Sequence, residues 1–188
     1  MSMQEDYDVL RLIGHNRICH VSSDNVRGCT LAEWIKHHPI ISKTQLMNWS
    51  YDIICQLEQI HKCRGNPSYQ YVNPYSIIIS EEGKLCFLDA SADSNKERIR
   101  LMQRNEIKKY FLPEEKIRKL NVQEELDIYG AGKTVQYLLA FTETKPRLTR
   151  KEVRKLKKMI IRCIDRNHRR AFQKMTEVKS YVSGIKNT

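Results

Sequence analysis

Three short patterns in the sequence could carry chemistry. Gly132-Lys133-Thr134 matches the end of a phosphate-binding loop, but the full pattern needs a glycine where Asp127 stands and a strand before it. His37 and His38 are neighbours, so on a helix they point to different faces and are poorly placed to share a metal ion. A cysteine nucleophile needs a base beside it and a setting that lowers its pKa, and the six scattered cysteines offer neither. None of these patterns predicts a site.

The cysteines instead predict a reduced protein. They form no C-x-x-C pair, which argues against a tetrahedral zinc site, and several lie in apolar stretches where a free thiol behaves as a small core side chain. Reduced thiols are typical of the cytosol. The first ten residues lack a basic region followed by an apolar run, and no stretch approaches the roughly 20 apolar residues of a membrane helix. We therefore expect a cytoplasmic protein with no integral membrane segment.

Charge indicates anionic partners. The chain has 33 Lys and Arg against 22 Asp and Glu, a formal net charge of +11, and much of the excess lies in residues 145–170. Lys151, Arg154, Lys155 and Lys158 share one face of a predicted helix. Such a stripe is typical of a solvated helix face, and the alternative is a docking surface for an acidic protein. Nucleic acid would also be attracted, although no reader motif accompanies the charge.

Helix signals are strongest after residue 30. Capping patterns occur at residues 30–33 (TLAE), 42–45 (SKTQ) and 149–152 (TRKE), and further helices are expected over residues 124–141 and 173–182. In the helix after residue 42, apolar residues recur at three- and four-residue spacing and predict one buried stripe. These residues are Leu46, Trp49, Ile53, Leu57 and Ile60.

Strands are expected in two places. Residues 7–13 and 17–21 flank a turn-like Gly-His-Asn and can form an N-terminal hairpin. Residues 76–79 and 85–88 flank a second turn and predict another hairpin, whereas the polar residues 90–109 show no strand pattern. The composition suits one globular unit, so the expected architecture is mainly α (α+β) with a small β element.

Six fragments in chain order resemble the C-terminal lobe of a protein kinase. They look like the hinge exit and its helix, the long helix before the catalytic loop, the catalytic loop H-R-D-L-K-P-x-N, the strand into D-F-G, the A-P-E motif, and the start of the central helix. They are residues 28–35, 51–61, 69–79, 85–91, 112–114 and 127–132. The resemblance implies a kinase-like C-lobe over residues 29–188, after an N-terminal remnant and hinge-like exit at residues 1–28.

The resemblance also implies that the parts needed for phosphoryl transfer are replaced. Tyr71 stands in place of the loop aspartate that accepts the hydroxyl proton, and a phenol is no base at neutral pH. Asn73 replaces the loop lysine and Ser76 the metal-binding asparagine. Asp89 keeps the D of D-F-G without its neighbours, so it either holds one Mg²⁺ weakly or merely ends a strand in a turn.

Upstream, the resemblance implies a much reduced or absent N-lobe. The first 27 residues contain one glycine, Gly14, and no lysine, so a Gly-rich loop and the strand lysine are missing. Apolar surface near Trp34, Tyr71 and Phe87 would then need a cover, either the N-terminal hairpin or a partner.

Other matched residues imply structural roles. Asp127 would accept hydrogen bonds from backbone amides of the loop, or would simply compensate the N-terminal charge of its helix. Glu114 would pair with an arginine near the last helices, for which Arg169 and Arg170 are the candidates because an ungapped match falls on Ala171.

We therefore expect a catalytically inactive, pseudokinase-like scaffold that binds a protein partner, with no cofactor. One alternative is a divergent Mg-ATP-dependent phosphotransferase that uses Asp89. The other is a basic module that binds nucleic acid or other anions.

Overall fold

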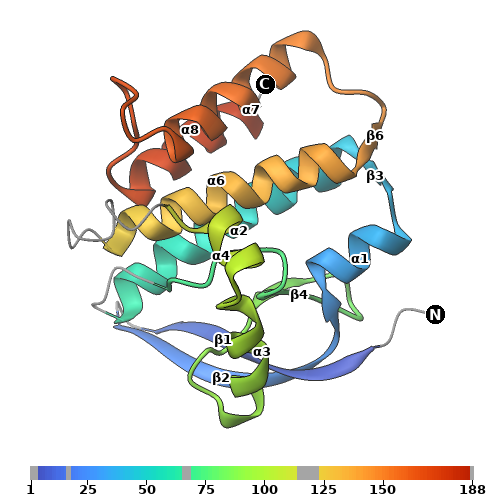
Figure 1. The fold of residues 1–188 in the computed structure, drawn as a ribbon, viewed down its shortest axis with the longest axis vertical. Coiled ribbons are helices and arrows are strands. Elements are labelled where there is room, and N and C mark those ends of the chain that lie inside the picture. The colour runs from blue at the N-terminus through green and yellow to red at the C-terminus, as the bar shows by residue number, and fades with distance from the viewer. Residues whose placement is uncertain (1–3, 16–17, 65–68, 114–122, 187–188) are drawn as a thin grey trace.

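The structure, a computed structural model, describes residues 4–15, 18–64, 69–113 and 123–186. About 55% of it is helical and 22% is strand, which confirms the mainly helical α+β expectation. Most helices lie on one face of a curled sheet, whereas Ile99 and Met102 of α3 (Lys96–Met102) cluster with Tyr7 and Val9 on the other face. The C-terminal helices α7 (Arg150–Ile164) and α8 (Met175–Lys186) lie farthest from the sheet (Figure 1).

A four-stranded antiparallel sheet has the order β1-β2-β4-β5. Its strands are β1 Glu5–His15, β2 Ile18–Thr30, β4 Ile77–Ser80 and β5 Leu85–Phe87. Both expected hairpins are therefore present, and the first is longer at both ends than the sequence indicated. Gly14 pairs with Cys19 inside the hairpin, so it belongs to the strand and not to the turn.

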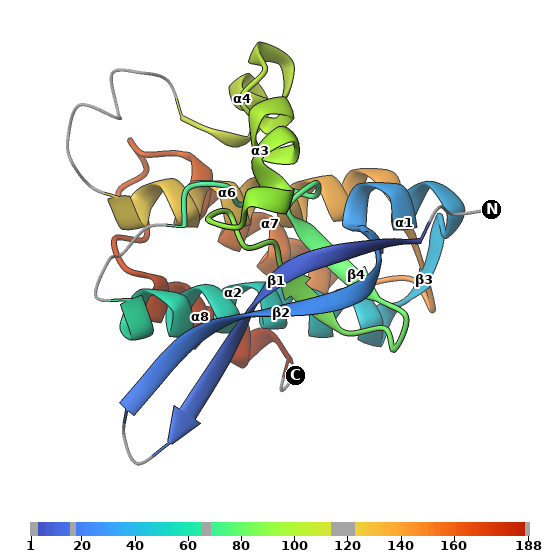
Figure 2. The same cartoon turned by 90° about the horizontal axis from the view of Figure 1, so that it is seen from below.

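The sheet curls enough to bring its two outer strands together. A bridge joins Val9 of β1 to Leu88, directly after β5. Figure 2 shows β1 and β2 side by side as one long hairpin. The hinge-like segment at residue 28 lies within β2, where Gly28 pairs with Ser80 of β4. A side chain there would collide with the Ile79 carbonyl oxygen, since a Cβ would lie 2.2 Å from it. The same sheet thus contains strands from the expected N-terminal remnant, residues 1–28, and from the part expected to form the C-lobe, residues 29–188.

In the described part of the chain, two helices lie between β2 and β4, and the remaining helices follow β5. They are α1 Leu31–His37, α2 Lys43–Arg64, η1 Asp93–Asn95, α3 Lys96–Met102, α4 Asn105–Phe111, α6 Gln123–Phe141, α7 Arg150–Ile164 and α8 Met175–Lys186. A short parallel pair, β3 Ile40–Ser42 and β6 Glu143–Lys145, was not anticipated.

The three capping patterns all form. Thr30 Oγ1 accepts from Glu33 N at 3.2 Å, and Ser42 Oγ accepts from Gln45 N at 2.9 Å. Thr149 and Glu152 form the complete capping box of α7. Side chains thus satisfy amides that a helix N-terminus leaves unpaired.

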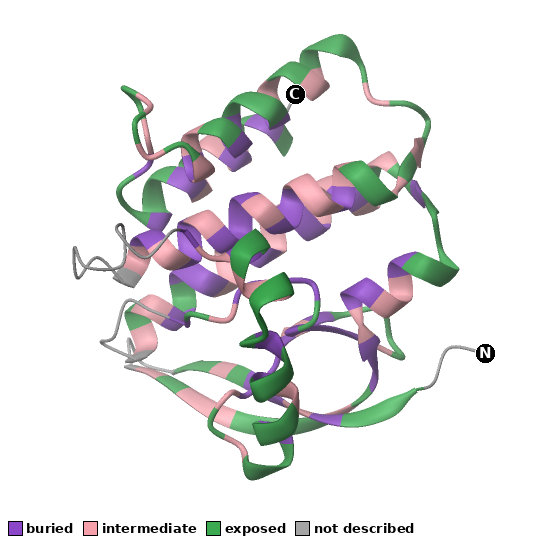
Figure 3. Ribbon diagram, viewed as in Figure 1, coloured by how far each residue is buried: buried purple, intermediate pink, exposed green. Residues whose placement is uncertain are grey.

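The core lies between α2, α6 and the two C-terminal helices. All five residues of the predicted stripe on α2 are buried, and α2 packs against α8 while α6 packs against α7 (Figure 3). Ile128, Val135 and Leu138 of α6 are fully buried.

Cys19 of β2 and Cys63 of α2 form a disulfide, with their Cα atoms 4.9 Å apart. The expectation that all six cysteines are reduced is therefore wrong, because a tertiary contact brought together two residues 44 positions apart. Cys29, Cys55, Cys86 and Cys163 are free. A lasting disulfide is rare in the cytosol, so the cytoplasmic location stays a prediction without support from the cysteines.

No helix in the described part of the chain is both long and apolar enough to cross a membrane.

Candidate functional site

Residues 69–76 form a loop between α2 and β4, where the kinase resemblance places the catalytic loop. Its backbone is bonded on two sides. Ala32 N of α1 donates to the Pro74 carbonyl at 3.0 Å, and Leu88 N donates to the Ser76 carbonyl at 2.8 Å. Through these backbone hydrogen bonds the loop is held against both α1 and the end of β5.

Asp127 of α6 anchors the start of this loop. Its carboxylate accepts from Tyr69 N at 2.6 Å and from Gln70 N at 2.7 Å, and His61 Nε2 lies 2.6 Å from Oδ2. The side chain of Asp127 is completely buried. The hydrogen bonds expected for Asp127 are present, while His61 was not anticipated as a third partner.

A strained residue follows that anchor. Gln70 has a φ of 70°, a left-handed conformation that costs a non-glycine residue about 1 kcal/mol. Two residues later the backbone passes directly over α6, where a Cβ on Gly130 would lie 2.7 Å from the Val72 carbonyl oxygen. The loop can reach Asp127 because position 130 has no side chain.

Asn73 and Ser76 use their side chains inside the loop. Asn73 Oδ1 accepts from Tyr75 N at 2.8 Å and from Ser76 N at 3.2 Å, and its amide donates to the Tyr71 carbonyl at 3.2 Å. The Ser76 hydroxyl donates to the same carbonyl. Both residues are buried, at 4% and 0% exposed. Their polar atoms hold the loop closed.

Asp89, which follows β5, is covered by the N-terminal hairpin. Its amide donates to the Asp8 carbonyl of β1 at 2.9 Å, and Asn95 Nδ2 donates to the carbonyls of both aspartates at 2.8 Å. Its Oδ1 accepts from the Ser91 amide at 3.0 Å and from the Ser91 hydroxyl at 2.6 Å. That pattern is an Asx turn, which agrees with the interpretation that Asp89 ends a strand in a turn.

Asp8 of β1 supplies a second carboxylate near this turn. Hydrogen bonds from Ser94 and Asn25 lower the pKa of Asp8, so this side chain stays ionised. Among the described residues, no three His, Cys, Asp or Glu side chains come together in a way that could hold a metal ion.

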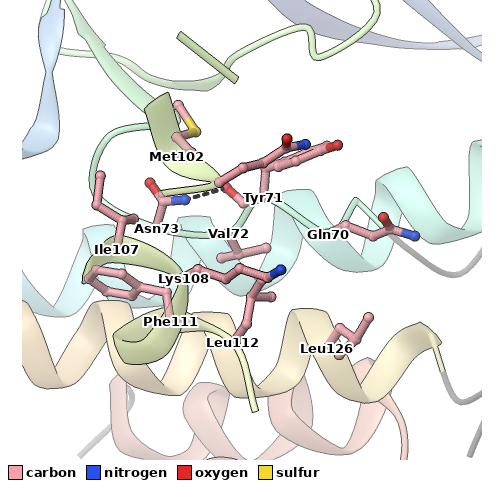
Figure 4. A pocket seen from close by; sticks show the side chains of 11 residues that line it. Gln70, Tyr71, Val72, Asn73, Met102, Ile107, Lys108, Phe111, Leu112 and Leu126 are labelled. Carbon is pink, nitrogen blue, oxygen red and sulfur yellow. Dashed lines mark hydrogen bonds between the residues drawn. The ribbon is translucent and has the colours of Figure 1, made fainter. Parts of the chain in front are cut away.

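Tyr71 lines a cavity of about 470 Å³ between the loop, α3, α4 and α6 (Figure 4). The walls are mainly apolar, with Val72, Phe111 and Leu126 among them, and Lys108 is the charged residue that lines it. Among the described residues of this lining there is neither Asp89 nor any other carboxylate. Such a cavity can bind an apolar group.

Neither a scan against protein-family models nor a search of curated proteins gives a match to this chain. The resemblance to protein kinases therefore stands on the residues of the chain itself and stays a prediction.

The apolar surface near Trp34, Tyr71 and Phe87 is largely covered. Phe87 is fully buried, and Trp34 and Tyr71 are half-buried. Tyr7 and Val9 of β1 pack with Leu88 and Ile78 in a cluster that Tyr71 borders. Of the two covers expected, the hairpin supplies the one beside Tyr71, whereas Trp34 packs against His38 and Trp49.

The predicted Glu114 pairing falls on a residue outside the described part of the chain. Arg169 and Arg170 are both exposed, and the Arg170 carbonyl accepts from Arg162 Nε at 2.6 Å. A different pair, Arg166 with Glu125 of α6, is nearly buried, at 12% and 10% exposed side chain. The sequence did not reveal this pair, although Glu125 lies two residues before Asp127.

The four cations predicted to share a face of α7 differ in how far they are exposed to solvent. Lys151, Arg154 and Lys158 are exposed, whereas Lys155 is half-buried and its carbonyl accepts from the Tyr181 hydroxyl at 3.4 Å. A role in docking stays a prediction for these residues.

Proposed function

We propose that this chain is a non-catalytic, protein-kinase-like module that binds other proteins. The observation that carries the proposal is the position of β1 on Asp89, with an amide–carbonyl bond of 2.9 Å to Asp8 and the adjoining bridge between Val9 and Leu88. In a phosphotransferase the aspartate after this strand holds Mg²⁺ against the nucleotide phosphates. Here a strand of the same chain packs over that position.

The loop supports the same conclusion. Asn73 and Ser76 are buried and bond to the loop backbone, so neither is available to hold a phosphate or a metal ion. Tyr71 replaces the base, and general-base catalysis alone typically contributes about 10²–10⁴ in rate. What remains is a rigid scaffold with a basic surface, which suits binding and not chemistry.

A thermal-shift measurement with Mg-ATP tests the proposal. We expect the melting temperature of the full chain to change by less than about 1 °C at millimolar Mg-ATP, because a ligand stabilises only the state that it binds. The matched control is Asp89→Asn, which removes the one carboxylate that the alternative requires. A rise of several degrees in the wild type that is lost in Asp89→Asn would establish a nucleotide site and overturn the proposal.

A further inference from the structure

The outer side of α7 carries a shallow groove of about 500 Å³ that the core does not use. Leu148, Val153 and Ile161 supply its apolar lining, and Ile161 is 45% exposed. The opposite side of the same helix is already packed, since Leu156, Met159, Ile160 and Cys163 are buried. Val153 and Ile161 therefore form a second apolar strip on this helix, on the side that faces the groove.

Four cations surround this strip. Arg150, Arg154, Lys157 and Lys158 line the groove, and all four are exposed. The first three lie eleven, seven and four residues before Ile161, so they share its face of the helix. The described residues of the groove lining include no carboxylate, so four positive charges surround an apolar centre.

No carboxylate in the described part of the chain pairs with any of these four cations, whereas some cations elsewhere on the surface do have such a partner. On α1, Lys36 pairs with Glu33, and on α3, Arg100 pairs with Glu97. The carboxylate nearest in sequence, Glu152, is occupied by Lys43 at 3.0 Å and by the capping box of α7. No ion pair among the described residues therefore compensates the positive field over the groove.

We propose that this groove binds an acidic amphipathic helix of a partner protein, an inference that rests on the proposed role as a protein-binding module. An apolar strip flanked by charges is how one amphipathic helix receives another. From Arg150 to Ile161 the groove spans about 16 Å, which is the length of about three helical turns. The partner helix carries apolar anchors on one face and Glu or Asp beside them.

The apolar strip favours this occupant over the other anions. A phosphate backbone would pair with the cations, but it would also take Ile161 out of water without supplying an apolar partner for it, and His168 is the one ring in the described lining on which a base could stack.

Selection from a display library of peptides about 16 residues long, with the full chain as bait, tests the inference. We expect enriched peptides to combine helical apolar spacing with net negative charge. For a selected peptide, Arg154→Glu with Lys157→Glu should weaken binding by at least about ten-fold, and Ile161→Ser by about three- to ten-fold. These side chains are exposed, so the melting temperature of each variant should match the wild type.

The matched control is Arg104→Glu with Lys109→Glu, two exposed cations near α4 whose replacement changes the net charge equally. Binding of the peptide to this variant should stay within about two-fold of the wild type, because screened charges far from the site contribute little. Three outcomes would overturn the inference: no enrichment, enriched peptides without acidic residues, or equal weakening by both charge reversals. Any of them combined with an absent Mg-ATP shift leaves the non-catalytic assignment intact.

Discussion

At the scale of single residues, the Asp127 carboxylate joins α6 to the backbone of the loop and to His61 of α2. Its carboxylate receives two backbone amides and lies 2.6 Å from His61, while Glu124 Oε1 lies 3.8 Å from the other nitrogen of that ring. All of this occurs with the Asp127 side chain completely buried. A buried carboxylate of this kind depends on every one of its partners.

Replacing Asp127 by asparagine should lower the free energy of unfolding by about 2–3 kcal/mol, because the new amide would face donors with a donor. Urea unfolding measures this change. Asp165→Asn is the matched control, since Asp165 is exposed and its side chain accepts a bond from Asn167 N. Equal losses for the two variants would contradict the role assigned to Asp127.

Glu58 of α2 provides a pH-dependent contact with α8. Burial alone would raise the pKa of its carboxyl, but Lys62 and Lys179 together lower the pKa below the ordinary value of 4.5. Lys179 Nζ lies 3.1 Å from Glu58 Oε2, and Lys62 pairs with the other oxygen.

A carboxyl whose pKa is lower in the folded state stabilises the protein at pH values above its unfolded pKa. That stabilisation is lost as the pH falls through the folded pKa. Glu58→Gln should cost about 1 kcal/mol at pH 7 and progressively less below pH 4.5, so its stability curve converges with the wild type in acid. Urea unfolding between pH 7 and pH 3 measures this, with the exposed Glu106→Gln as control. A constant difference across that range would count against the assignment.

At the scale of elements, close approach between α6 and its neighbours depends on two glycines. Besides Gly130 under the Val72 carbonyl, Gly132 lies against α7, where a Cβ would be 2.4 Å from the Cys163 Cβ. Burial at that contact raises the pKa of the Cys163 thiol to about 12, so this cysteine stays protonated as a core residue. Both contacts are between backbones or the stems of side chains and have little room to adjust.

Gly130→Ala and Gly184→Ala should therefore change stability in opposite directions. At position 130 the added methyl group meets backbone, and we expect a loss of about 1–3 kcal/mol. At position 184, inside α8, a Cβ would meet nothing within 4 Å, so alanine should stabilise by about 0.5–1 kcal/mol through helix propensity. Melting temperatures of the two variants test this pair, and a shared sign would refute it.

Elements with strong local signals could be predicted from the sequence. The capping box at Thr149 and Glu152 and the buried stripe that includes Trp49 and Ile53 depend on spacing within one helix, and both are present. The β3–β6 pair could not be predicted, because three-residue strands show no period and their parallel pairing joins residues about 100 positions apart.

In the candidate site, too, some contacts could be predicted from the sequence and others could not. The bonds of Asp127 to the loop amides were expected from the kinase resemblance, and the turn at Asp89 was one of two alternatives. The contacts of Ser76 and Asn73 with the Tyr71 carbonyl depend on how the loop folds back on itself. The pairing of Arg166 with Glu125 depends on how α6 packs against the end of α7. Neither has a signature in the sequence.

At the scale of the whole molecule, the N-terminal hairpin covers the end of β5 and packs beside Tyr71 of the loop. It is held at the tip side by the Cys19–Cys63 disulfide to α2 and near its base by the Val9–Leu88 bridge and the Asp8–Asp89 contact. Arg98 of α3 adds an ion pair with Glu5 at 2.5 Å and lies over the ring of Tyr7. The cover is therefore fastened at several points along its length.

Amide-resolved hydrogen exchange at Asp89, with and without Mg-ATP, tests this account most directly. Because the Asp89 amide donates to the Asp8 carbonyl at 2.9 Å, we predict slow exchange in the free protein and no change when nucleotide is added. An Asp89 amide that exchanges as fast as an exposed loop, or one that Mg-ATP slows further, would contradict a hairpin that closes this position.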